Sequence, residues 1–410
     1  MPRRLLLGFA GVVLLALPTT CKVYPDSLLD PLPGSTSTIE PATGIGFWSG
    51  QGDGSCFSAR QPTDDFRPPP SDAPDLDPIF LGVDQLWLGG QRIDGTVDKN
   101  AWQDFGFDLD NTCTASPTCE EHTATSCKRT QAGLVPDGNH CRDNNFGKLQ
   151  NIVSGSADIG GRYGLNDGSF NCGLCYGKYN LLIRISGYNG TPNDDKVRVD
   201  LYRSPGLEID LPLKNCDGDP ATRLCWWISN TPWTIDRKST TNSQANSLSE
   251  AQIADASAFV RDGYLIARFP KKALIWFPGT YLNTTTFPLL LTHGLVSARL
   301  ARASDGTFRL SDGVIGGRVT NDDVLQSFRW VGLCEGDPLF PIAKSSVQAN
   351  LDIATEPDSP PDAPCDALSL GIVFSARQAI PGKLVDGPDL VECPPPVGSG
   401  GSAGVAGQGG

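Results

Sequence analysis

The sequence predicts a mainly β protein, and more specifically a two-sheet β-sandwich of jelly-roll type with a few short helices and long disulfide-stapled loops. In many segments apolar and polar residues alternate with the two-residue period of a half-buried strand. The chain holds 46 Gly and 33 Pro, and only eight of its 46 acidic residues are Glu, so most are Asp, which favours turns over helices. Its 13 cysteines fit an oxidising compartment.

The N-terminus has the layout of a secretory signal peptide. Arg3 and Arg4 precede an uncharged apolar run over residues 5–17, which is too short to span a bilayer. Cys21 follows this run and is similar to the cysteine of a bacterial lipobox, which becomes the lipidated first residue of the mature protein. We expect an exported protein that is lipid-anchored through Cys21 at the outer membrane or cell surface. A Cys21 that is free or paired between molecules is the alternative.

The chain divides into four segments by composition. A tether rich in Pro, Ser and Thr follows the signal peptide, and a Gly-rich tail, too poor in apolar residues to form a core, ends the chain. The expected segments are a signal peptide at residues 1–20, a tether at 21–43, a single large β-sandwich domain at 44–393 and a disordered tail at 394–410.

The net charge of −13 bears on the partners of the protein. An acidic surface is repelled by phosphate backbones and anionic headgroups. We therefore expect no nucleic-acid partner, and contact with the membrane only through the N-terminal lipid. A carbohydrate or another envelope protein is the partner class that stays open.

Strands account for most of the expected secondary structure. Helices are fewer: Ser247 with Glu250 forms a capping-box pattern before residues 251–260, and Thr320 precedes two aspartates at the start of a second helix that runs to Phe328. The expected strands are residues 79–88, 179–186, 197–202, 224–229, 264–269, 273–277, 289–291, 295–302, 308–310 and 314–319.

Setting Cys21 aside leaves an even number of cysteines, which can close as six disulfides. Neighbouring pairs are expected, with Cys113 bonded to Cys119 or Cys127, and Cys216 bonded to Cys225 across a turn. Connectivity does not follow from the sequence alone. The twelve cysteines are Cys56, Cys113, Cys119, Cys127, Cys141, Cys172, Cys175, Cys216, Cys225, Cys334, Cys365 and Cys393.

The last three cysteines are Cys334, Cys365 and Cys393. Two of them are expected to pair with each other. The third then needs a distant partner, for which Cys56 is the candidate.

Cys172 and Cys175 form a CxxC motif, which marks a redox site when it lies at the start of a helix in a thioredoxin-like unit. Here the motif is followed by the expected strand at residues 179–186. Structural disulfides are therefore the predicted role of both cysteines.

The segment around the first cysteines carries a candidate calcium site. Hard cations take six to eight oxygen ligands from carboxylates, amides and carbonyls. An EF-hand is excluded, because Cys113 and Cys119 stand where that motif requires Gly and Glu. The alternative is that these side chains cap turns beside disulfides. The candidate ligands are Asp108, Asp110, Asp137, Asn139 and Asp143.

Aromatic residues supply the candidate ligand-stacking positions Trp226, Trp227 and Trp233. Tryptophan rings can stack on sugars, although adjacent tryptophans in a large β protein often face the core. No catalytic residue is predicted. A carboxylate pair for glycoside hydrolysis cannot be picked out among 46 acids.

Three phrases of the sequence carry a resemblance: GFDLDNTCT, DGNHCRDNNFGKLQNI and CDALSLGIVF. They resemble phrases of uncharacterised cysteine-containing secreted lipoproteins of myxobacterial type, over most of residues 40–393. The resemblance implies a lipoprotein and no particular activity. We expect an envelope protein that serves binding, adhesion or structure rather than catalysis, the alternative being a secreted polysaccharide-active hydrolase with a carboxylate pair.

Overall fold

The computed structural model describes residues 58–154, 166–209, 231–269, 272–277, 287–390 and 393. Contacts within the chain separate Met1–Glu40 from Pro41–Gly410, and every described residue belongs to the second unit. The predicted signal peptide, the tether and Cys21 therefore lie outside the described residues.

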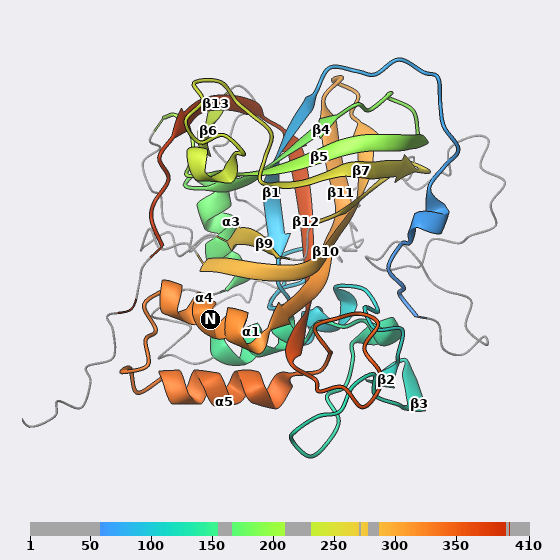
Figure 1. The fold of residues 1–410 in the computed structure, drawn as a ribbon, viewed down its shortest axis with the longest axis vertical. Coiled ribbons are helices and arrows are strands. Elements are labelled where there is room, and N and C mark those ends of the chain that lie inside the picture. Colours follow the sequence, from blue (N-terminus) through green and yellow to red (C-terminus); the bar gives the residue numbers. More distant parts are fainter. Residues whose placement is uncertain are drawn as a thin grey trace, which may run out of the picture. The chain divides into compact units, whose positions relative to one another are not determined.

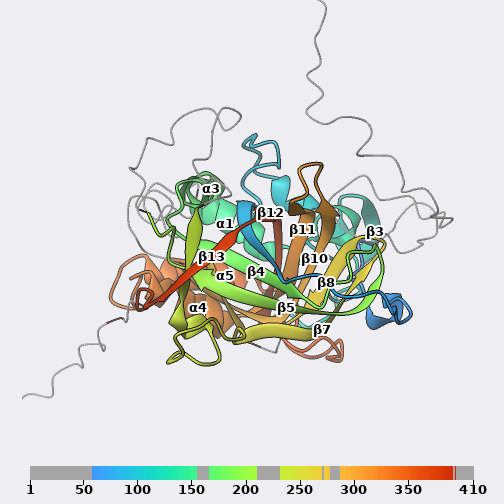
Figure 2. The same cartoon turned by 90° about the horizontal axis from the view of Figure 1, so that it is seen from above.

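Eight antiparallel strands close into a barrel (Figure 1). They are β1 (Ile79–Trp87), β4 (Asn180–Ser186), β5 (Asp194–Ser204), β7 (Ile253–Arg261), β8 (Tyr264–Arg268), β10 (Phe287–Arg302), β11 (Phe308–Thr320) and β12 (Ala367–Gln378). Around the barrel the order is β11, β12, β1, β4, β5, β7, β8 and β10, and β10 pairs back with β11. Figure 2 views these strands from above. Closure gives each of these eight strands a partner on both sides over at least part of its length.

The predicted two-sheet sandwich is therefore wrong, and one misassigned segment explains much of the error. The helix expected over residues 251–260 is strand β7, which pairs with β5 on one side and with β8 on the other. The Ser247 and Glu250 pattern does not cap a helix. Its apolar residues fit a strand, because Ala258 and Val260 face the main core while Phe259 packs against a second apolar cluster.

Long, bent strands are the second reason why the prediction of a two-sheet sandwich is wrong. The segments expected at 289–291 and 295–302 are one strand, β10, and those at 308–310 and 314–319 are one strand, β11. Both strands shift register in the middle, near His293 and near Asp312, and both of these residues have positive φ. Such bulges bend a strand and let it wrap around a barrel, whereas in the sequence they look like turns between short strands.

The barrel interior is a packed apolar core. Along β12, the side chains of Leu368, Leu370 and Ile372 belong to the main core, while Ala367 and Val373, which flank them, pack in separate clusters on the outer face. This alternation is the two-residue period of a strand. An eight-stranded barrel has an interior that side chains can fill.

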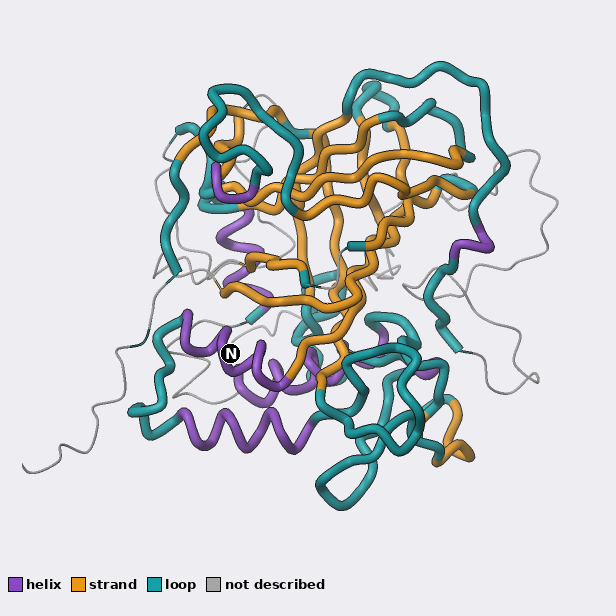
Figure 3. Tube along the Cα trace, viewed as in Figure 1, coloured by secondary structure: helices purple, strands orange, loops and turns teal. Residues whose placement is uncertain are grey.

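Four helices complete the described fold: α1 (Asn145–Ser154), α3 (Asp167–Cys175), α4 (Asn321–Trp330) and α5 (Phe340–Asn350). In Figure 3, α1, α4 and α5 gather below the strands, and their apolar residues join the main core. The predicted helix after Thr320 is confirmed as α4, and the Thr320 side chain accepts a hydrogen bond from the Asp323 N–H group. None of the described helices is long and apolar enough to cross a membrane.

Shorter elements flank the barrel. The parallel pair β6 (Pro232–Asp236) and β13 (Ile380–Val385) covers Leu182 and Tyr202 on the outer face. The expected strand at 224–229 lies outside the described residues. The remaining elements are β2 (Thr114–Ser116), β3 (Cys119–Thr123), β6 (Pro232–Asp236), β9 (Ala273–Phe277), β13 (Ile380–Val385), and the short 3₁₀ helices η2 (Asp64–Phe66), η3 (Ala101–Asp104), η4 (Asn139–Cys141) and η6 (Arg237–Ser239).

Three disulfides join described residues. Cys334–Cys393 is confirmed as a pair within the last three cysteines. Cys113 bonds to Cys141, not to Cys119 or Cys127, so the expected neighbour pairing is wrong.

The remaining described disulfide is Cys127–Cys365, which spans 238 residues. Cys365 therefore has a distant partner, but this partner is Cys127 and not Cys56. Sequence distance misled the prediction, because loops remote in sequence meet on the barrel surface. Cys56, Cys216, Cys225 and the Cys119 side chain lie outside the described part of the chain.

Candidate metal centre

The candidate site lies on the outer face of the barrel, against strands β11 and β12. Residues 105–110 cross this face at close range. A Cβ atom on Gly371 of β12 would lie 2.6 Å from the Gly106 Cα atom, and Gly106 has a φ of +100° that side chains disfavour. The Phe107 ring occupies the space that a side chain at Gly316 of β11 would need. Glycines of β11 and β12 thus allow residues 105–110 to lie directly on these two strands, here called the β11 and β12 wall.

A second acidic segment is held against this loop by hydrogen bonds. The Asp143 N–H group donates to the Phe107 carbonyl at 2.8 Å, and the Leu109 N–H group donates to the Asp143 Oδ2 atom at 2.6 Å. The Cys113–Cys141 disulfide joins the two segments directly beside their acids. Local structure and one covalent bond therefore bring together carboxylates that lie more than thirty residues apart in the chain.

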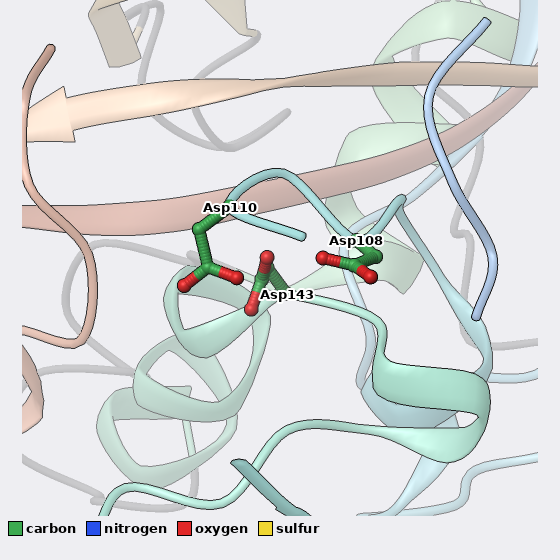
Figure 4. A group of neighbouring side chains, drawn as sticks. All are labelled: Asp108, Asp110 and Asp143. Atoms are coloured by element: carbon green, nitrogen blue, oxygen red, sulfur yellow. The ribbon is translucent and has the colours of Figure 1, made fainter. Parts of the chain in front are cut away.

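Three carboxylates meet at this junction: Asp108, Asp110 and Asp143, here called the carboxylate cluster. One oxygen from each lies within 4.8 Å of the others, and Figure 4 shows the three groups turned toward a shared space. The Asp108 side chain is only 2% exposed. Its Oδ2 atom accepts a hydrogen bond from the Ser58 hydroxyl group, but its Oδ1 atom is buried without a hydrogen-bond partner. A buried carboxylate oxygen without a partner is costly unless a cation or a proton satisfies it.

The spacing of the carboxylate cluster fits a calcium ion. Two oxygens that each lie 2.3–2.6 Å from the same Ca²⁺ ion can be up to about 5 Å apart. Asp110 is the half-buried member of the cluster. Two hydrogen bonds fix the orientation of its carboxylate: the Thr112 N–H group donates to Oδ1 at 2.8 Å, and the Ser126 hydroxyl group donates to Oδ2. Carboxylate oxygens without imidazole or thiolate neighbours favour hard cations such as Ca²⁺, Mg²⁺ or Mn²⁺.

Two further acids and two bases, Arg60 and Arg318, act on the carboxylate cluster. Asp137 and Asp352 both interact electrostatically with its members. The Asp352 carboxylate accepts two hydrogen bonds from Ser369 of β12, one from the backbone N–H group and one from the hydroxyl group. Arg318 of β11 is 2% exposed, donates to the Leu109 carbonyl at 2.7 Å and lies near enough to act on the acids. Five acids face two bases, so protons or a cation must neutralise the remaining carboxyl groups.

The pKa values reflect this crowding. Burial, opposed by the Ser58 hydrogen bond, raises the pKa of Asp108 to about 6, and burial likewise raises that of Asp352 to about 6. Burial, together with the neighbouring acids, raises the pKa of Asp137 to about 9 and that of Asp143 well above its usual value. Without a cation the site holds protons near neutral pH, and a bound cation would allow the same carboxyl groups to ionise.

The structure brings together part of the predicted ligand set. Asp108, Asp110 and Asp143 converge and Asp137 lies nearby, but the Asn139 side chain instead donates to the Asp104 carboxylate at 2.7 Å. Sequence reasoning missed Asp352 and Arg318. These two residues lie about two hundred positions further along the chain and carry no motif, so only the folded barrel shows that they belong to the site.

Comparison of the chain with protein-family models found no match, and neither did comparison with curated proteins or with solved structures. The chemistry of the carboxylate cluster therefore rests on its own geometry and charge.

The other sequence-predicted positions do not form a second site among the described residues. Trp226 and Trp227 lie outside the described residues, and Trp233 in β6 is fully buried and offers no face for a sugar ring. Cys172 and Cys175 fall at the C-terminal end of α3, not at a helix start, and each is disulfide-bonded. A thioredoxin-like redox site would instead need the CxxC motif at the start of a helix.

Proposed function

We propose that the protein is an exported, lipid-anchored envelope protein whose β-barrel binds calcium and serves binding, adhesion or envelope structure. The observation that carries the calcium proposal is the convergence of Asp108, Asp110 and Asp143, with the Oδ1 atom of Asp108 buried and unpartnered. A cation among these three carboxylates would satisfy that oxygen and offset the excess of buried negative charge.

Calcium suits this site better than the smaller hard cations. Mg²⁺ demands near-ideal octahedral geometry at about 2.0–2.1 Å and keeps most of its water, whereas Ca²⁺ accepts irregular sets of protein oxygens. The carboxylate cluster is irregular, because its members come from two separate loops and are already bound to backbone and hydroxyl groups.

Binding at this position has a structural consequence. The carboxylate cluster joins residues 105–113 to residues 137–145, here called the acidic loops, and both lie on the β11 and β12 wall. A cation would fasten these loops to each other and to the barrel. Calcium would therefore act as a structural element, as disulfides do in the same region.

The proposed location in the cell envelope is supported by the disulfides and by the N-terminal sequence, not by the carboxylate cluster. Disulfides form and persist in oxidising compartments, and three of them join described residues. The signal pattern of the first twenty residues and the position of Cys21 support lipid anchoring. Metabolic labelling with a fatty-acid probe tests this part: the wild-type protein is expected to take up the label, and a Cys21→Ala variant is not.

The rival hydrolase function gains no support from the carboxylate cluster. Glycosidases place two carboxyl groups about 5–10 Å apart on either side of a substrate cleft. Asp108 and Asp143 are 2% and 1% exposed and accept hydrogen bonds from the protein itself, so a sugar chain has no access to them.

Calorimetric titration of the purified protein with Ca²⁺ tests the calcium proposal. We expect one bound ion per chain, with affinity lost in Asp108→Asn, because the amide keeps the side-chain shape but removes the charge. Asp77→Asn changes an exposed acid and is the matched control, with unaltered affinity expected. Absence of binding to the wild-type protein, or equal binding to Asp108→Asn, would contradict the proposal.

A further inference from the structure

A cavity opens in the barrel wall where strand pairing is interrupted. β8 pairs with β7 only from Phe259 to Arg261, and β9 pairs with the first part of β10, from Phe287 to Leu291. Among the described strands, the start of β7 therefore has no partner on the side that faces the β9–β10 ribbon. A cavity of about 760 Å³ lies at this gap, within the range of about 300–1,000 Å³ that is usual for small-molecule sites.

The walls of the cavity are apolar on two sides. Leu274 and Leu290 are directly paired across β9 and β10, so they share a face, and both line the cavity. The sequence neighbours of Leu290, Leu289 and Leu291, are fully buried in the main core on the opposite face. From the other side Leu201 of β5 and Ile253 of β7 line the same space.

Basic side chains also line the cavity, although the chain as a whole is strongly acidic. Arg203, Lys238 and Lys272 contribute to its lining, and Asp389 is the acid among the lining residues. Arg203 is directly paired with Leu181 across β4 and β5, so both lie on one face of the sheet. This is a local reversal of the overall charge of −13.

The basic groups already bind carboxylates of the chain. Arg203 pairs with Asp236, which is fully buried and therefore fixed, and Lys272 pairs with Asp323 at 3.2 Å. The remaining pair, Lys238 with Asp389, differs because its side chains are 51% and 86% exposed. An exposed ion pair of this kind contributes little in water and exchanges readily. The Asp389 carboxylate thus marks a position at the cavity where an anionic oxygen fits.

We propose that this cavity binds a small amphipathic monocarboxylate, whose carboxylate takes the place of the Asp389 side chain at Lys238 while its apolar part lies against Leu274, Leu290 and Ile253. The exchange keeps Lys238 paired and releases Asp389 to solvent. It also covers the apolar wall, and each buried methylene group is worth about fourfold in affinity. Arg203, which also interacts with the Asp389 charge, reinforces the selection for an anion.

Sodium decanoate is the probe, and decanol, which has the same chain without the charge, is its matched control. Binding is measured by calorimetry on the calcium-saturated exported protein, so that the carboxylate cluster does not enter the result. We expect decanoate to bind more tightly than decanol, and shorter straight-chain acids to bind progressively more weakly, by about fourfold per methylene.

Two substitutions at the cavity have opposite expected signs. Asp389→Asn removes the competing carboxylate and should strengthen decanoate binding about threefold or more. Lys238→Gln removes the charged donor and should weaken it about fivefold or more. Decanol should respond to neither variant, and Leu290→Trp, which fills the cavity, should weaken both probes.

Equal binding of decanoate and decanol would overturn the proposal, and so would Asp389→Asn weakening decanoate binding. Failure of decanoate to bind while calcium binds normally would refute this inference alone and leave the calcium site intact. Circular dichroism of each variant confirms that a changed affinity does not come from unfolding.

Discussion

The barrel interior and the acidic loops are stabilised in opposite ways. Inside the barrel, apolar side chains from alternate positions of eight strands fill the space, and residues such as Leu81 and Leu370 are fully buried. The acidic loops have few apolar residues of their own. They depend on three apolar anchors, Phe105, Phe107 and Leu109, on the Cys113–Cys141 disulfide and on polar contacts around the carboxylate cluster.

This difference shows which part of the molecule can respond to its surroundings. Burial of apolar groups does not depend on calcium, on redox state or strongly on pH. The interactions of carboxylates depend on pH and on bound calcium, and disulfides depend on the redox state. The stability of the acidic loops should therefore respond to calcium, oxidation and pH, whereas that of the barrel interior should not.

A cavity in the barrel core should have the largest effect. Leu370→Ala removes a fully buried side chain from β12, and such changes cost about 2–5 kcal/mol. Urea unfolding should show the same loss with and without calcium, because the residue belongs to the core. A loss that calcium restores would break the proposed separation of the two regions. Val97→Ala, at an exposed apolar residue, is the control.

The pH dependence of stability should have opposite signs in the two states of the carboxylate cluster. Without calcium, the folded-state pKa values of Asp108 and Asp352, about 6, lie above the unfolded value of 3.8. The folded state then holds protons that the unfolded chain has lost, so stability falls as the pH rises from about 4 to about 6. Asp137, with a pKa of about 9, extends this fall in stability toward pH 9.

With calcium the trend should reverse, because the ion binds ionised carboxylates and competes with protons. The stabilisation by calcium, seen as a rise in melting temperature, should therefore be small at pH 5 and grow toward pH 8. It corresponds to about 3 kcal/mol in the free energy of unfolding when calcium is at one hundred times its dissociation constant. Thermal unfolding at several pH values measures both trends. A stability of the calcium-free protein that rises between pH 5 and pH 8 would contradict the account.

Loss of the disulfide next to the carboxylate cluster should destabilise the fold and also weaken calcium binding. Replacing Cys113 and Cys141 together by Ser opens a loop of 28 residues, at a cost of about 2–4 kcal/mol. Calcium affinity should fall about tenfold or more, because Asp110 and Asp143 are no longer held together. Replacing Cys334 and Cys393 by Ser is the matched control, with a comparable loss of stability and unchanged affinity.

The smallest effect is expected at the start of helix α4, where neither Thr320 nor Asp323 belongs to the carboxylate cluster. Thr320→Ala removes the hydrogen bond from the Asp323 N–H group to the Thr320 hydroxyl, which measures 3.1 Å. Loss of such a cap costs about 1 kcal/mol. Urea unfolding should show this loss equally with and without calcium, whereas a change in calcium affinity would show that the two regions are coupled.

Local signals in the sequence were sufficient for some elements. Strands β1, β4 and β5 follow from alternation, and the capped helix α4 follows from a capping residue, and both signals act over a few positions. Strand β7 was predicted as a helix because a capping-box pattern outweighed the alternation of Ala258, Phe259 and Val260. Closure of the barrel depends on β10 meeting β11 and on β1 meeting β12, and no local signal specifies the second of these pairs.

The candidate site was also predictable only in part. Asp108, Asp110 and Asp143 could be chosen from the sequence because carboxylates cluster near cysteines there. The Cys113–Cys141 bond, by contrast, follows from how the acidic loops lie on the wall. The contribution of Arg318 likewise requires the folded strand β11.

The most direct test of the account is a crystal structure of the protein grown with calcium, with an anomalous difference map calculated for the ion. The account predicts one peak 2.3–2.6 Å from oxygens of Asp108, Asp110 and Asp143. The absence of a peak there, with Asp108 Oδ1 bound instead to a protein donor, would contradict it.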